Sequence, residues 1–262
     1  MKFQHRAIDW CAVLLSTLLL GACVNGAKME RDDDRGSADA HRSAGIRLQL
    51  AGEYYRHGQL QTALSEARRA LRMQPDFVDA YNMAALIYME LGDAPHAEEY
   101  FSHALRLAPK DPELNNNYGW FLCSNGRPEL SIAYFETALS DRSYRSPAKA
   151  MTNAGLCSLK QGRLTTAETY LNDAFRLEPS NPATAIGLSR LYLRLGDMRR
   201  ARFFIERATS SEEATAEALW LAIQIEHRSG DRAAESMWAT QLRRRFPDSP
   251  EFAAYQRGAF NE

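Results

Sequence analysis

Glycine and other small or apolar residues recur along most of the chain with a period of about 34 residues. Glycine returns at intervals of 34, 34, 36, 34 and 34 residues, at Gly58, Gly92, Gly126, Gly162, Gly196 and Gly230. A small residue usually stands five and twelve positions after each of these glycines, and proline often follows. Glycine ends helices readily and proline stops them. Each period therefore predicts two antiparallel helices.

This period divides the chain from residue 44 onward into six units and a short tail. The expected units are 44–77, 78–111, 112–147, 148–181, 182–215 and 216–249. The longer interval predicts a two-residue insertion, which we place within residues 141–147. The sixth unit departs from the pattern, because Glu226 and Glu235 stand where other units carry bulky or small apolar residues. We expect residues 250–262 to form a capping helix over this weaker end.

The repeating unit resembles the tetratricopeptide repeat, a helix-turn-helix motif of 34 residues. The resemblance implies an all-α fold, a right-handed superhelical solenoid of six repeats with a C-terminal capping helix. One helix pair cannot bury its own apolar face, so the units must stack into a continuous core.

In tetratricopeptide stacks the first helices of the units line a concave groove. Asparagine amides can donate to and accept from a peptide backbone, and a large aromatic side chain is a common anchor. The candidate partner-binding residues are Asn82, Asn116, Asn117, Trp120, Asn153 and Leu156. The same surface is expected to include Lys149, Thr152, Ile186, Arg190, Arg194, Trp220 and Gln224. An alternative for Trp120 is that it packs against its neighbours within the stack.

Two cysteines lie on the first helices of adjacent units, at Cys123 and Cys157. Neighbouring helices pack with axes about 8–10 Å apart, and a disulfide needs Cα atoms within about 7 Å. We predict a structural disulfide between them, and two buried free thiols are the alternative.

The first residues have the pattern of an export signal. Lys2 and Arg6 precede an apolar run over residues 12–20, and the sequence Leu-Gly-Ala-Cys that ends at Cys23 resembles a bacterial lipobox. The resemblance implies that residues 1–22 are a signal peptide and that Cys23 carries lipid. The alternative is an ordinary secretory signal with a chance cysteine. Residues 23–43 carry three consecutive aspartates and no apolar period, so we expect a flexible tether.

Lipoprotein sorting adds a location to this interpretation. The residue after the acylated cysteine is Val24, not aspartate, which favours the outer membrane. The expected arrangement is a lipid-anchored protein at the outer membrane with its folded part in the oxidising periplasm.

The composition excludes several other functions. With 32 basic and 33 acidic side chains the net charge is −1, so we expect no nucleic-acid partner. The sequence has no Gly-rich phosphate loop, Cys-x-x-Cys pair or His-Glu-x-x-His motif. His96, Glu99 and His103 alone resemble metal ligands, and an exposed helix face explains them more simply. We expect no enzymatic activity, cofactor, metal or small-molecule substrate.

Two segments of the sequence carry a resemblance that is more specific than the tetratricopeptide pattern. The stretches NNNYGWFLCSNGR (115–127) and NAGLCSLKQGR (153–163), with the lipobox and six repeats, resemble the PilF/PilW family of type IV pilus assembly lipoproteins, or pilotins. The resemblance implies a protein that binds PilQ-like secretin subunits and promotes their localisation and multimerisation in the outer membrane, in support of twitching motility. The alternative is a periplasmic scaffold that docks cell-wall hydrolases or other envelope proteins.

Overall fold

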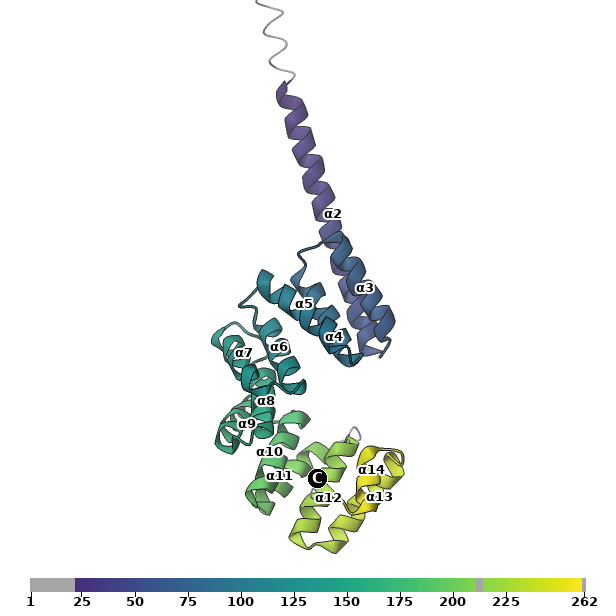
Figure 1. The fold of residues 1–262 in the computed structure, drawn as a ribbon, viewed down its shortest axis with the longest axis vertical. Helices are drawn as coiled ribbons and strands as arrows, with labels where there is room; N and C mark the ends of the chain where they lie inside the picture. The colour runs from purple at the N-terminus through teal and green to yellow at the C-terminus, as the bar shows by residue number, and fades with distance from the viewer. Residues whose placement is uncertain (1–21, 211–213, 261–262) are drawn as a thin grey trace, which may run out of the picture. The chain divides into compact units, whose positions relative to one another are not determined.

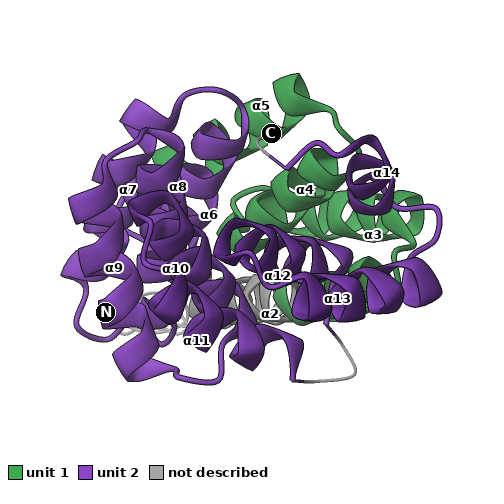
Figure 2. Ribbon diagram, turned by 90° about the horizontal axis from the view of Figure 1, so that it is seen from below, with its two compact units in different colours: residues 1–107 green, residues 108–262 purple. Residues whose placement is uncertain are grey.

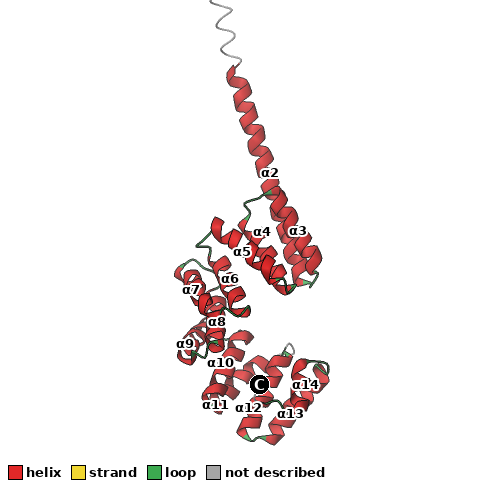
Figure 3. Ribbon diagram, viewed as in Figure 1, coloured by secondary structure: helices red, strands yellow, loops and turns green. Residues whose placement is uncertain are grey.

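The computed structural model describes residues 22–210 and 214–260, and side chains from residue 39 onward. Within these residues it contains helices and connecting loops but no strand (Figure 3). Apart from Ala22, the predicted signal peptide at 1–22 lies outside the described residues, and the Cys23 side chain is not described either. No helix in the described part of the chain combines the length and apolarity needed to span a bilayer.

The chain divides into two compact units, residues 1–107 and 108–262 (Figures 1 and 2). The helices of the first unit are α2 (Ala22–Arg56), α3 (Leu60–Met73), α4 (Val78–Glu90) and α5 (Ala94–Leu107). The helices of the second unit are α6 (Pro112–Ser124), α7 (Pro128–Ser140), α8 (Pro147–Lys160), α9 (Leu164–Leu177), α10 (Pro182–Leu195), α11 (Met198–Thr209), α12 (Ala216–Ser229), α13 (Arg232–Arg245) and α14 (Pro250–Arg257).

Consecutive helices pair within each repeat, and the pairs stack. In the second unit α6 packs on α7, α8 on α9, α10 on α11 and α12 on α13. The first helices also contact one another from repeat to repeat, α6 with α8, α8 with α10 and α10 with α12. The predicted all-α tetratricopeptide fold is confirmed. The loop between α7 and α8 covers residues 141–146, whereas that between α9 and α10 covers residues 178–181, so the two extra residues lie in the loop at 141–146.

The periodic glycines end the first helix of each repeat. All six have φ between 69° and 77°, in the left-handed region that only glycine enters without a steric penalty. At Gly196 the chain reverses and Asp197 N–H donates to the carbonyl of Tyr192 at 2.9 Å. Asp197 then caps α11 by accepting from the N–H of Arg200. The glycines of the 34-residue period thus stand where the backbone needs a positive φ.

A second set of glycines permits close helix packing. A Cβ at Gly119 would lie 2.8 Å from the ring of Phe135, and one at Gly155 would lie 2.5 Å from Leu171 Cγ. Phe135 and Leu171 are both fully buried in the core. The first helices α6 and α8 can therefore approach α7 and α9 only because these positions lack a side chain.

The C-terminal end is covered as predicted. Helix α14 begins at Pro250 behind the N-cap Ser249 and contacts α12 and α13. Phe252, Tyr255 and Phe260 pack against the apolar cluster formed by Leu219, Ile223, Ala239 and Leu242. The cap removes from water the apolar face that a seventh repeat would otherwise cover.

The two unusual glutamates of the sixth unit are buried and paired. Glu226 is 3% exposed and accepts from Arg202 Nε at 2.8 Å, with a second bond from the same guanidinium. This hydrogen bonding raises the pKa of Arg202. Glu235 is 7% exposed and lies 3.2 Å from His227 Nδ1. The sixth unit therefore keeps the repeat geometry with polar pairs in place of apolar packing.

The flexible tether expected at residues 23–43 is not what the structure shows. Helix α2 runs without a break from Ala22 to Arg56, and its later part packs on α3 with Ala44 and Ala51 fully buried. Residues 28–31 are Lys, Met, Glu and Arg, which all have high helix propensity. Extending a helix that packing has already nucleated costs little, so charge alone did not indicate coil here.

Replacing Gly155 tests the close packing of the helices. We expect Gly155→Ala to lower the free energy of unfolding by about 1–3 kcal/mol, because the new Cβ overlaps Leu171. The matched control is Gly45→Ala in α2, where no atom lies within 4 Å of the added Cβ. Alanine there should be neutral or stabilising by roughly 0.5–1 kcal/mol. Urea unfolding measures the free energy of unfolding of both variants. If the two variants are equally stable, the close packing at Gly155 does not require a glycine.

The ion pair between buried Glu226 and half-exposed Arg202 can be tested with a double mutant. We expect Arg202→Met to destabilise the protein by about 3 kcal/mol, because it leaves the Glu226 carboxylate buried without its partner. The double variant Arg202→Met/Glu226→Leu should regain most of that loss, since two apolar side chains need no compensation. Thermal unfolding followed by circular dichroism gives the comparison. If the double variant is no more stable than Arg202→Met alone, the unpaired Glu226 carboxylate is not the cause of the lost stability.

Candidate functional site

The first helices of the second unit form the walls of a groove with a volume of about 410 Å³. Its lining residues are Trp120, Leu156, Leu159, Lys160, Ala183, Ile186, Arg190, Arg194 and Glu217. They come from α6, α8, α10 and α12, one helix from each of four successive repeats. The groove thus exists because the repeats stack with their first helices side by side.

Trp120 anchors one end of this groove. Its side chain is half-buried and packs against the buried cluster of Cys123, Phe135, Ala154 and Cys157. Lys160 Nζ lies 5.7 Å from the centre of the indole ring, a cation–π distance. The ring packs within the stack and also lines the groove, and its contact with a partner stays a prediction.

The prediction that Asn116 and Asn117 present their amides to a partner is wrong for this structure. Asn116 is fully buried and Asn117 is 5% exposed. Asn116 Nδ2 donates to Asn117 Oδ1 at 3.2 Å, and Asn153 Nδ2 donates to Asn116 Oδ1 at 3.0 Å. Lys149 Nζ also lies 3.4 Å from Asn117 Oδ1. The amides satisfy one another across the seam between α6 and α8, since a buried polar group needs a partner.

The other candidate residues are dispersed. Leu156 lines the groove beside Trp120. Asn153 is half-buried and is held by its bond to Asn116. Asn82 is half-buried on α4, in the first unit. The structure therefore brings together Trp120 and Leu156 with Ile186, while the asparagines contribute to the stack.

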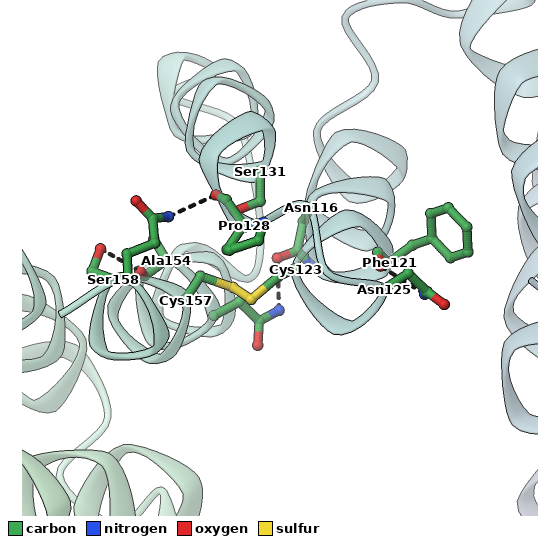
Figure 4. Close-up of a disulfide and its surroundings, with 11 residues drawn as sticks. Asn116, Phe121, Cys123, Asn125, Pro128, Ser131, Ala154, Cys157 and Ser158 are labelled. Carbon is green, nitrogen blue, oxygen red and sulfur yellow. Dashed lines mark hydrogen bonds between the residues drawn. A yellow bond between two sulfur atoms is a disulfide. The ribbon is translucent and has the colours of Figure 1, made fainter. Parts of the chain in front are cut away.

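The structure contains a disulfide between Cys123 on α6 and Cys157 on α8, with Cα atoms 5.9 Å apart (Figure 4). Both cysteines are buried, at 2% and 0% exposure. Figure 4 labels Asn116 and the disulfide together, and the amide row, which is Asn116, Asn117 and Asn153, joins the same two helices as the disulfide. This double connection fixes the wall of the groove that carries Trp120 and Leu156.

Basic side chains border the groove and continue beyond it. A second hollow of about 350 Å³ shares Arg190 and Arg194 with the first and is further lined by Leu193, Leu221, Gln224, Arg228 and Phe260. Arg190 forms an ion pair with Glu217. Lys160 and Arg228 were not among the candidates from the sequence. They occupy the same repeat position as Arg194, and comparing that position across repeats would have found them.

The arrangement offers a binding surface, with no cluster suited to metal binding among the described residues. His96 Nδ1 lies 2.7 Å from Asp93 Oδ2, a hydrogen bond that lowers the pKa of Asp93. His103 stacks on Tyr81 with ring centres 4.1 Å apart. Each histidine thus has its own neighbour on α4 or α5 or in the turn between them.

Sequence comparison defines the class of protein. Profiles described as tetratricopeptide repeat match residues 48–112 and 122–182, and others match 100–133 and 158–223. The chain is a tetratricopeptide-repeat protein.

Individual relatives narrow the family further. The crystal structure of PilW, described as a widely conserved type IV pilus biogenesis factor, is 35% identical with a TM-score of 0.74, covering 81% of this chain and 98% of PilW. The type IV pilus assembly protein PilF of Pseudomonas aeruginosa is 27% identical over 243 residues, 93% of this chain and 95% of PilF. A solved structure of Pseudomonas aeruginosa PilF shares the fold, with a TM-score of 0.71, 24% identity, and coverage of 84% of this chain and 99% of that one. The chain belongs to the PilF/PilW family of type IV pilus biogenesis factors.

Removing the disulfide tests its contribution to the groove. We expect the double variant Cys123→Ser/Cys157→Ser to lose about 3–4 kcal/mol of unfolding free energy, because the bond closes a loop of 34 residues. Reductant should lower the stability of the wild type by a similar amount and leave the double variant unchanged. Denaturant unfolding with and without reductant gives both values. A wild type that is insensitive to reductant would contradict this role.

Proposed function

We propose that the protein is an outer-membrane lipoprotein adaptor of type IV pilus biogenesis that binds secretin subunits and promotes their localisation and multimerisation. The observation that carries the proposal is the groove formed by Trp120, Leu156 and Ile186 on three stacked first helices. Membership of the PilF/PilW family supports the biological setting. The protein acts by binding, without catalysis.

The groove has the features of a site for a protein segment. A large aromatic side chain at one end and aliphatic side chains beside it supply apolar area, and such anchors dominate the binding energy of interfaces. The disulfide and the amide row hold α6 against α8 before a partner arrives. A preformed site loses less conformational entropy on binding than a flexible one.

The lipid on Cys23 confines the adaptor to a membrane surface. Two or more acyl chains make attachment stable, because each buried methylene contributes about 0.8 kcal/mol. A secretin subunit held by an anchored adaptor stays near the membrane where the ring assembles, and its effective concentration there rises. Localisation and multimerisation then follow from one binding event.

The adaptor role is tested by deleting the gene and measuring heat-stable secretin multimers in the outer membrane. We expect the multimers to disappear and the wild-type gene to restore them. The double variant Trp120→Ala/Leu156→Asp should fail to restore them, because it removes the apolar anchors.

The matched control is Leu130→Asp on α7, which changes an exposed leucine that does not line the groove. It should restore the multimers as well as the wild type. Normal multimers in the deletion strain would refute the adaptor role. Affinity capture that recovers cell-wall hydrolases in place of secretin would indicate the docking-scaffold alternative.

Acylation is measured separately by mass spectrometry of the mature N-terminus. We expect acyl chains on Cys23, and a Cys23→Ser variant should be unprocessed and leave secretin multimers misplaced. A mature protein without acyl groups would contradict the lipid anchor, whereas the proposal that the groove binds secretin would still stand.

A further inference from the structure

Three basic residues form a row along the groove of the second unit. Lys160, Arg194 and Arg228 follow one another at intervals of 34 residues, near the ends of α8, α10 and α12. All three side chains are exposed, and each lines one or both of the hollows described above. We call these three residues the cation row.

The two arginines of the cation row are held in place without being neutralised. Arg194 Nη1 donates to the carbonyl of Leu159 at 2.6 Å, and Arg228 Nη1 donates to the carbonyl of Leu193 at 3.2 Å. The same contact therefore recurs one repeat later, each arginine bonding to the preceding repeat. Carbonyl oxygens orient the guanidinium groups but carry no net charge.

The positive charges of the cation row are not paired with acidic side chains among the described residues. Among the ion pairs between described residues, none includes Lys160, Arg194 or Arg228. Glu217 is the one carboxylate that lines the 410 Å³ groove, and it pairs with Arg190. The groove and the adjoining hollow thus offer three positive charges, two in the groove and Arg228 in the hollow, beside the apolar side chains of the groove.

The chain itself shows that this surface accepts a peptide segment with an aromatic side chain. Phe260 lines the hollow next to Arg228. Its ring stacks on His227 with centres 3.7 Å apart and lies 5.5 Å from the centre of Trp220. Gln224 Nε2 donates to the Phe260 carbonyl at 3.3 Å. An aromatic ring and a backbone carbonyl are therefore both recognised by the face of α12.

We propose that the groove binds an extended acidic segment of the partner, with carboxylates about three residues apart and apolar or aromatic side chains between them. Neighbouring helices lie about 8–10 Å apart, and three residues of extended chain span about 10 Å. Each carboxylate can then meet one member of the cation row, while an apolar side chain enters between Trp120, Leu156 and Ile186. The inference rests on the proposed function in taking the segment to belong to the secretin subunit.

The chemistry is tested first with a defined probe. The probe is a fluorescein-labelled peptide with Asp at every third position and Phe and Ser between, compared with the same peptide carrying Lys in place of Asp. Fluorescence anisotropy should show binding of the acidic peptide that weakens as salt is raised, and no binding of the basic one. Equal binding of the two peptides would overturn the inference.

Variants assign the binding to the cation row. The triple variant Lys160→Gln/Arg194→Gln/Arg228→Gln keeps side-chain donors for the two carbonyls but removes the charges. We expect it to bind the acidic peptide at least about tenfold more weakly, because three charge pairs are lost. The control Arg163→Gln/Arg199→Gln/Arg232→Gln removes one exposed charge from each of the same repeats outside the groove and should bind like the wild type. Equal affinities of the two triple variants would overturn the inference.

Capture of the purified secretin subunit separates this inference from the proposed function. We expect the wild type and the control to capture the subunit and the cation-row variant to lose it. Equal capture by all three proteins overturns the acidic-segment inference and leaves the adaptor role standing. If the wild type binds the acidic peptide but captures no secretin, the groove chemistry stands and the proposed function fails.

Discussion

The close approach of helices at positions without a side chain is the constraint on which the second unit depends. Gly119 faces Phe135 and Gly155 faces Leu171 so closely that a Cβ atom at either glycine would overlap the facing side chain. Each helix pair leaves an apolar face that the next pair, or the capping helix α14 at the end, must cover, so the repeats stack. Stacking in turn sets the first helices side by side, and that row of helices is the groove.

Polar groups refine what this packing creates. The row of asparagine amides and the disulfide both join α6 to α8, at the end of the groove where Trp120 lies. Further along the stack, the buried carboxylate of Glu226 on α12 pairs with the half-exposed guanidinium of Arg202 on α11 in place of apolar packing. The two arginines of the cation row are oriented by backbone carbonyls of the preceding repeat. The surface a partner meets is thus positioned by the same contacts that hold the stack together.

The sequence was sufficient to predict the repeat architecture, because the glycine at each turn has a backbone conformation that few other residues tolerate. The pairing of Cys123 with Cys157 followed from the same register. The burial of Asn116 could not be predicted from the sequence. A shift of one residue along the helix decides whether an amide faces solvent or the adjacent helix.

Two other features of the chain were missed from the sequence, for different reasons. The helical residues of α2 before residue 44 carry charges that favour solvent in coil and helix alike, so composition does not separate the two states. The cation row depends on which repeat position faces the groove. Its signal was present as a basic residue at 160, 194 and 228, the repeat position that already made Arg194 a candidate, and comparing that position across repeats would have found all three.

The central claim is that a preformed groove on the first helices captures a segment of the partner. Hydrogen–deuterium exchange of the mature protein, with and without the purified secretin subunit, measures this most directly. The account predicts added protection in α8, α10 and α12 and in the part of α6 around Trp120, with α7, α9, α11 and α13 unchanged. Protection confined to the second helices, or spread evenly over the chain, would contradict it.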